Sequence, residues 1–316
     1  MTNPQRLSTL LVFLAIHGCF GFAGTPAGAT GPTTPTDDTG AQTDHQRAER
    51  AREMTLELNL SVVPELEITD SSGNFDLAIA ELELELPFLS ISVAQLDFTW
   101  NGAEALPFSG GSARPWETLT TVELRKDFTR PIRDDLFFTS SIGLGLSFEE
   151  EITDSYAANA FAAVLWNQSA DWSFLFGVGY FWHPEVDVEF DVFPAIGVSY
   201  RQYAERGFWA SLGIPQTGFG YRFSPASSLS LSADAQTFVS RLADDSPVAI
   251  AGYAELVRFD VGLYYEHVFG DRFEIKAGPT FGFEGELKIH DRQGVLLETY
   301  DLESVAGFSL AMAVRF

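Results

Sequence analysis

The chain has 316 residues and a formal net charge of −25 at pH 7, with 46% hydrophobic and 20% charged residues. This hydrophobic content excludes a compositionally disordered chain, and the length is sufficient for a large barrel or a sizeable core. The acidic balance excludes nucleic acid as a partner, because binding to phosphates requires a basic surface.

The N-terminus has the features of an export signal. Arg6 precedes an apolar run from Leu7 to Ile16, and Ala27-Gly28-Ala29 is a small-x-small cleavage site. Because the run is too short to span a membrane, we interpret residues 1–29 as a secretory signal peptide. Residues 30–53 are rich in Thr, Pro and Gly at their start and have no apolar face afterwards, which predicts a flexible linker.

The chain contains one cysteine, Cys19, and it lies in the leader. A disulfide framework and a thiolate metal site are therefore not expected in the mature protein. The stretch Ile16-His17-Gly18-Cys19 resembles the box that directs lipidation of bacterial lipoproteins, although His17 stands where a small residue is usual. Lipidation of Cys19 and simple removal with the leader both stay open.

Residues 54–316 repeat one unit, a strand-length run followed by a turn cluster. No run of 18 apolar residues occurs there, so a membrane-spanning helix is not expected. A closed barrel is the other structure that crosses a bilayer with all backbone groups paired. The fold class that we predict is all-β, an antiparallel transmembrane β-barrel of about 12–14 strands, with the pair Gly207–Phe223 as the doubtful one. The expected runs are Met54–Val63, Asp76–Leu86, Phe88–Trp100, Trp116–Phe128, Leu136–Phe148, Tyr156–Trp166, Trp172–Trp182, Phe190–Arg201, Gly207–Ile214, Gly218–Phe223, Ser228–Arg241, Val248–Val268, Arg272–Glu286 and Leu302–Phe316.

The last run carries the strictest alternation. Every second residue back from the C-terminus is apolar, and the residues between are small or polar. This pattern resembles the assembly signal of bacterial outer-membrane proteins, which implies the barrel assembly machinery as a partner. The residues of this predicted signal are Phe308, Leu310, Met312, Val314 and Phe316.

Two further patterns distinguish a membrane barrel from a soluble sandwich. Five tryptophans lie at or near the ends of runs, as in the aromatic girdles of membrane barrels: Trp100, Trp116, Trp166, Trp172 and Trp182. Trp209 is the exception. The connections also alternate between short turns and longer, often acidic loops along most of the chain, which is typical of outer-membrane barrels. We therefore expect an outer-membrane location, with Phe316 on the periplasmic side and membrane lipid around the barrel.

If the apolar face of each run points outward, the charged residues between point into the lumen. Both signs occur, and acids dominate, so these side chains form either structural ion-pair networks or the lining of a solute path. The candidates are Glu81, Glu83, Glu85, Glu123, Arg125, Arg258, Asp260, Glu266, Glu274, Lys276, Glu284, Glu303 and Arg315.

An enzymatic role is not expected. The spacing predicts no Ser–His–acid grouping, and the sequence has no nucleophile elbow, phosphate loop or zinc motif. His183 with Glu185, Asp187 and Glu189 imitates a metal site, but such a stretch is typical of a solvated loop. We predict no catalytic residue, no metal and no cofactor.

A second resemblance covers residues 193–316. Phe193-Pro194-Ala195-Ile196-Gly197-Val198, then Trp209 to Pro215, Gly220 to Ser224 and Leu229 to Ala233, resemble a family of bacterial outer-membrane barrels classed as a domain of unknown function. The resemblance implies no binding residues. The function we expect is porin-like passage of small solutes, with cations among the candidates. The alternatives are a structural or surface-binding barrel with a filled lumen and, third, a barrel lipase or protease.

Overall fold

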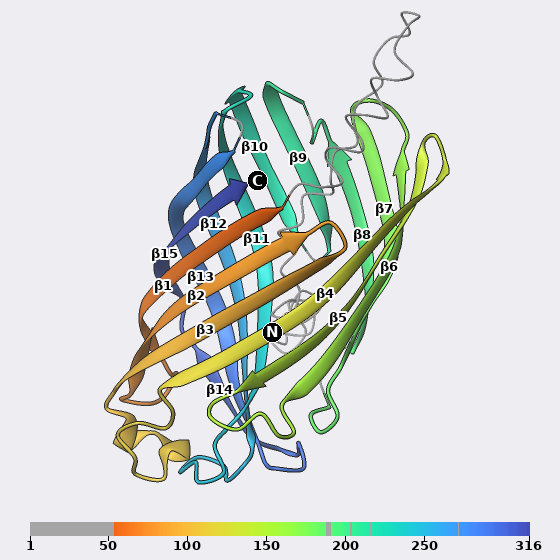
Figure 1. Ribbon diagram of the computed structural model, residues 1–316. Helices are drawn as coiled ribbons and strands as arrows, with labels where there is room; N and C mark the ends of the chain where they lie inside the picture. Colours follow the sequence, from red (N-terminus) through yellow and green to blue (C-terminus); the bar gives the residue numbers. More distant parts are fainter. Residues whose placement is uncertain (1–53, 188–190, 203, 215, 271) are drawn as a thin grey trace, which may run out of the picture.

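The computed structural model describes residues 54–187, 191–202, 204–214, 216–270 and 272–316. The predicted signal peptide and linker lie outside these residues. The described part is all-β apart from two short 3-10 helices, η2 (Ala103–Ala105) and η3 (Pro107–Ser109) (Figure 1). No helix in the described ranges has both the length and the hydropathy to cross a membrane. The strands are β1 (Thr55–Glu67), β2 (Asn74–Leu86), β3 (Leu89–Asn101), β4 (Thr118–Arg133), β5 (Leu136–Phe148), β6 (Tyr156–Asn167), β7 (Trp172–Trp182), β8 (Val192–Tyr200), β9 (Gly207–Ile214), β10 (Thr217–Ser224), β11 (Ser227–Arg241), β12 (Tyr253–Phe269), β13 (Phe273–His290), β14 (Leu296–Leu302) and β15 (Val305–Arg315).

Fourteen of these strands close into one antiparallel barrel. Strands β1 to β13 pair in sequence order, β13 then pairs with β15, and β15 pairs back with β1. The closing pairs include Leu58 with Met312 and Lys276 with Ala311. Strand β14 is the fifteenth strand of the sheet and only extends the end of β13. The two short strands predicted within Gly207–Phe223 are confirmed, since β9 and β10 both belong to the wall.

The two ends of the barrel differ. Both termini of the described chain and short connections such as Pro225–Ala226 lie at one end, the short-turn end, where the Met54 and Phe316 backbones hydrogen-bond to each other. The other end, the loop end, carries the long connections and η2 and η3 (Figure 1). The connection between β9 and β10 is the exception there, because it is short. The segment 287–301 is also more ordered than expected, since it forms the β13–β14 hairpin.

Most of the outer face is apolar, as the alternation predicts. Large side chains such as Ile142, Leu144 and Phe176 are more than half exposed on this face. Trp172 and Trp182 stand at opposite ends of β7, each 43% exposed, where a girdle residue would lie. The terminal strand follows the same rule, with Phe308 51% exposed and paired to the exposed Val62.

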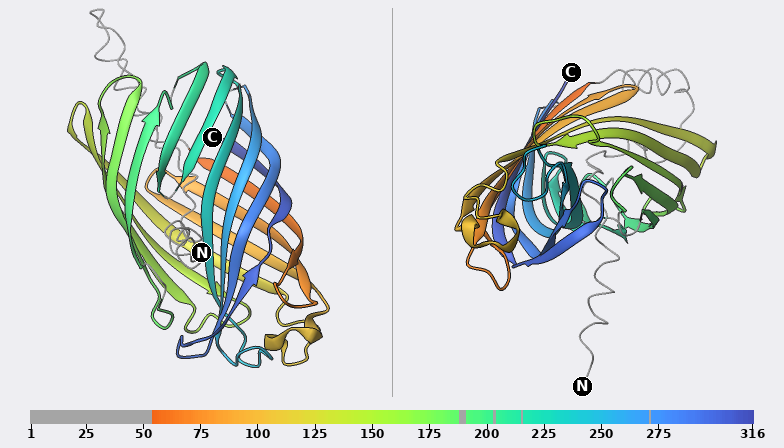
Figure 2. Two further views of the ribbon diagram at one scale, coloured as in Figure 1. Left: turned by 180° about the vertical axis from the view of Figure 1, so that it is seen from behind. Right: turned by 90° about the horizontal axis from the view of Figure 1, so that it is seen from below.

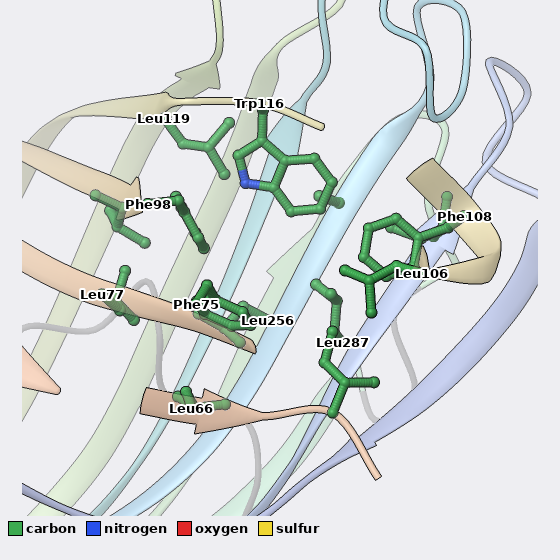
Figure 3. Close-up of a cluster of buried hydrophobic side chains, with 14 of the residues drawn as sticks. Leu66, Phe75, Leu77, Phe98, Leu106, Phe108, Trp116, Leu119, Leu256 and Leu287 are labelled. Carbon is green, nitrogen blue, oxygen red and sulfur yellow. The ribbon is translucent and has the colours of Figure 1, made fainter. Parts of the chain in front are cut away.

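A large apolar core fills the loop end of the barrel between β1–β4 and β12–β14. Figure 3 shows side chains from these strands and from η3 converging on one another. Trp116 is 1% exposed, and its ring meets those of Trp100, Phe98 and Phe108 with centroids 5.0, 5.7 and 5.9 Å away. This cluster, which we call the loop-end core, corrects the expectation that Trp100 and Trp116 belong to a girdle.

At the loop end, two strands from opposite parts of the wall contact each other across the interior of the barrel. Strand β11 meets β5 from the opposite part of the wall, with Arg241 paired to Phe148 in parallel. The Glu149 N–H donates to the Arg241 carbonyl at 2.8 Å, and the Ser147 and Ser240 hydroxyls lie 2.6 Å apart. The outline seen from below in Figure 2 is accordingly far from circular. A second, smaller cluster of Phe181, Val186, Val239 and Tyr253 lies on the far side of this seam.

Candidate functional site

An acidic inner wall is the first feature of the barrel interior. Alternation in β2 places Glu81, Glu83 and Glu85 on one face, and register aligns Glu83 with Glu57 of β1 on one side. On the other side Glu83 aligns with Ser92 of β3, and Ser92 aligns with Glu123 of β4. Five carboxylates from three strands therefore share one inward surface.

A single guanidinium stands among these acids. Arg125 Nη2 lies 3.3 Å from Glu83 Oε1, and its Nε lies 3.3 Å from Asp127 Oδ2. Asn159 of β6 donates from Nδ2 to Glu123 Oε1 at 3.1 Å. The side chains of Glu83 and Arg125 are 5% and 11% exposed, so this pair is shielded from bulk water. One guanidinium cannot pair with five carboxyl groups, so acidic groups outnumber basic groups on this wall.

The opposite wall, from β11 to β15, holds a mixed set of charges. Arg258 Nη2 lies 2.7 Å from Asp260 Oδ1, and Arg315 Nη2 lies 2.8 Å from Glu274 Oε2. Glu266 accepts a hydrogen bond from the Ser228 hydroxyl at 3.4 Å. Here Arg258, Lys276 and Arg315 stand beside Asp234, Asp260, Glu266 and Glu274, so acids outnumber cations by less than on the acidic wall.

The structure places most of the candidate lumen residues on the inner face. The residues with inward register are Glu81, Glu83, Glu85, Glu123, Arg125, Arg258, Asp260, Glu266, Glu274 and Lys276. Arg315 shares this register at the rim of the short-turn end. Glu303 is a correction: it is exposed in the connection between β14 and β15, because β15 begins only at Val305. The side chain of Glu284 lies outside the described ones.

The loop-end core is the feature that the sequence reasoning missed. Its signal is an inversion of the alternation within single strands. In β3, Ile91 and Val93 point outward, but further along the same face carries Asp97 and Thr99 while Phe98 points inward. The outer face of the loop end is thus polar and its inside apolar, the pattern of a water-soluble sheet.

A buried histidine fastens the loop after β7 to this end of the barrel. His183 Nδ1 accepts hydrogen bonds from the backbone N–H groups of Glu185 and Val186, at 3.3 and 3.0 Å, and its ring meets Tyr253 edge-on. Burial lowers the pKa of His183 to about 4, the nearby His290 lowers it as well, and Glu255 opposes both. The neutral ring is therefore part of the folded structure.

The same loop touches the β13–β14 connection. His290 Nε2 lies 2.9 Å from Glu255 Oε2, and its Nδ1 lies 3.2 Å from the Gly294 carbonyl. Gly294 has a φ of 73°, and a Cβ there would lie 1.7 Å from the Glu185 carbonyl oxygen. Only glycine fits this contact, which closes two loops over the barrel end.

A Ser–His pair lies on the outer face near the short turns. Ser227 Oγ is 2.8 Å from His267 Nδ1, and the Tyr265 hydroxyl is 3.5 Å from both. Within the described residues, no carboxylate is hydrogen-bonded to His267. The pair has no orienting third group of the kind that a serine nucleophile uses. Among all the residues that the structure describes, no three His, Cys, Asp or Glu side chains lie close enough together to form a metal site.

Comparison with known proteins returns the architecture at low similarity. No protein-family model and no curated protein matches the sequence, so no family is assigned and the resemblance over residues 193–316 stays a prediction. Among solved structures, the chain is similar to a FadL homologue from Pseudomonas aeruginosa, at 11% identity over 83% of this chain and 90% of that chain, with a TM-score of 0.41. It is also similar to the Pseudomonas putida toluene transporter TodX (8% identity, 83% and 89% covered, TM-score 0.40) and to the KdgM porin (5%, 83% and 99%, 0.34). At TM-scores below 0.5, these similarities carry no argument about this chain.

Proposed function

We propose that this protein is an outer-membrane channel for small solutes that favours cations. The observation that supports the proposal is the acidic inner wall of β1, β2 and β4, where Arg125 is the one cation among five glutamates. A charged lining of one sign raises the local concentration of the opposite ion and selects for it. The apolar outer face supports the placement in a membrane.

A second candidate is a closed barrel with a structural or surface-binding role. The loop-end core favours it, because 19 buried hydrophobic residues from both walls pack together at that end. The seam between β5 and β11 narrows the same end. A barrel closed in this way would conduct only if the core or the loops move.

Planar bilayers distinguish the two candidates. For a channel we expect discrete conductance steps and a reversal potential in a salt gradient that shows cation preference. In the triple variant Glu81→Gln, Glu83→Gln, Glu85→Gln, the preference should fall towards unity. A matched triple variant of exposed loop-end acids, Asp97→Asn, Glu104→Gln and Glu117→Gln, should retain it.

Two outcomes would count against the channel. Silence of the wild-type protein, together with steady conductance after Trp116→Ala, would mean that the loop-end core closes the barrel. Selectivity that survives loss of the three β2 glutamates would remove them from the permeation path.

A further inference from the structure

The β4–β5 hairpin projects past its neighbour at the short-turn end. Strand β3 pairs with β4 only as far as Ser90 with Arg125, whereas β4 continues with β5 as far as Arg133 with Leu136. The edge of β4 beyond Arg125 therefore has no strand beside it, and every residue from Lys126 to Asp134 is exposed. Unpaired backbone groups are not stable in hydrocarbon, so this part of the hairpin has to lie in a hydrated layer.

The outward face of this hairpin combines cations with large apolar groups. Register places Lys126, Phe128 and Arg130 on the same face as Ile142 and Phe138 of β5, and the exposed Ile132 follows at an irregularity in the pairing. Phe128, Ile132 and Phe138 are 46, 57 and 40% exposed. Apolar groups with cations between them are the pattern of a surface at the boundary between acyl chains and headgroups.

The two cations are available for an anion. Within the described residues Arg130 has no carboxylate partner, and the Lys126 ammonium lies 5.1 Å from the centre of the Phe128 ring. The acids of the hairpin are otherwise engaged or distant from this face: Asp127 pairs with Arg125, and Asp135 pairs with Arg133 at 2.6 Å. Asp134 remains at the tip. In a protein of net charge −25, this is a local basic surface.

We infer that Lys126 and Arg130 form a binding site for the phosphate of an anionic phospholipid in the membrane leaflet at the short-turn end, with Phe128, Ile132 and Phe138 against its acyl chains. The planar guanidinium would hold two phosphate oxygens, and the ammonium would act as a point charge. The inference requires only that the barrel lies in a bilayer. It does not depend on conduction.

The test measures thermal unfolding of the full chain in neutral detergent micelles titrated with phosphatidylglycerol or phosphatidylcholine. We expect the melting temperature to rise at lower concentrations of phosphatidylglycerol than of phosphatidylcholine. Each basic side chain near an anionic surface contributes about a fivefold change in affinity, so Lys126→Gln with Arg130→Gln should remove about 25-fold of the preference. Arg133→Gln is the matched control, because Arg133 is in the same hairpin but already paired, and it should retain the preference.

Equal responses to the two lipids would overturn the inference, as would a double variant that keeps the wild-type preference. Inorganic phosphate forms the third arm. A shift with phosphate alone as large as that with phosphatidylglycerol would mean an adventitious anion site instead of a lipid site. Faster migration of the unboiled variants on a gel verifies that they are folded, so a lost preference cannot reflect a lost barrel.

Discussion

In β2 the inner face carries Glu81, Glu83 and Glu85 towards the short turns, but Phe75 and Leu77 towards the loops. The outer face of the same strand changes in the opposite sense, from Leu82 and Leu84 to Asn74 and Asp76. The two regions differ in the medium around them. Where lipid surrounds the wall, apolar groups face outward and polar groups gather inside. Where water surrounds it, the hydrophobic effect drives apolar groups into the interior, as in a soluble protein.

The loop end is stabilised by burial of apolar side chains in a protein core, and the belt by their contact with lipid. Burial of the loop-end core removes Trp116, Phe75 and Leu77 from water, all at 0–1% exposure. In the lipid-facing belt, acyl chains fill the space left by a truncated side chain, whereas a truncation in the core leaves a cavity. Changes in the core should therefore cost more than similar truncations in the belt.

The largest expected effect is that of Trp116→Ala. Deleting a fully buried tryptophan leaves a cavity and should lower the free energy of unfolding by about 3–5 kcal/mol. Trp172→Ala in the girdle is the control and should cost clearly less, because Trp172 is 43% exposed. Urea unfolding in lipid vesicles measures both. Equal losses would mean that the loop-end core is not a stabilising centre.

A charge scan on the outer face tests where lipid ends. Leu144→Arg places a cation among the exposed apolar side chains of β5, opposite Leu124, and should cost about 2–4 kcal/mol of unfolding free energy. Thr99→Arg puts the same group on the outer face of the loop end, where the effect should be within about 0.5 kcal/mol. The same unfolding assay compares the two. A Thr99→Arg cost as large as that of Leu144→Arg would place the loop end in the membrane.

The loop end should also be the acid-sensitive region. The pKa of His183 falls from 6.5 to about 4 on folding, so the unfolded chain binds the proton first as the pH drops. Stability from this group is complete above pH 6.5, declines between pH 6.5 and 4, and is lost below. The loss should be at most about 3.5 kcal/mol, from 1.4 kcal/mol per pKa unit.

The pH dependence can be assigned with a variant. Unfolding free energies at pH 7.5 and 4.5 give the wild-type slope, and His183→Gln should flatten it because Gln does not titrate. Glu255 and His290 face His183 in the fold, and Glu185 follows it in the loop, so their titration must be followed in the same variant. An unchanged slope would assign the acid sensitivity to those neighbours.

The barrel architecture could be predicted from the alternation in the sequence. Strict alternation in the last strand and in β2, β5 and β8, with short turns at one end, is enough to specify inward and outward faces, because the side-chain period of a strand is two. The alternation also predicts that Glu81, Glu83 and Glu85 point inward. The fourteen strands of the barrel lie within the predicted range of 12–14.

The contents of the loop end follow from the tertiary structure and cannot be predicted from the alternation. Periodicity assigns Trp100 and Trp116 to strand ends, but it does not say whether lipid, water or protein lies beside them. That answer depends on the long-range packing of β1–β4 against β12–β14 and on the seam where Arg241 meets Phe148. Ser227 and His267, His183 and Tyr253, and Arg125 and Glu83 are separated by 40, 70 and 42 residues along the chain. Pairing of neighbouring strands brings the first and third pairs together, and packing of the loop after β7 against β12 brings the second together.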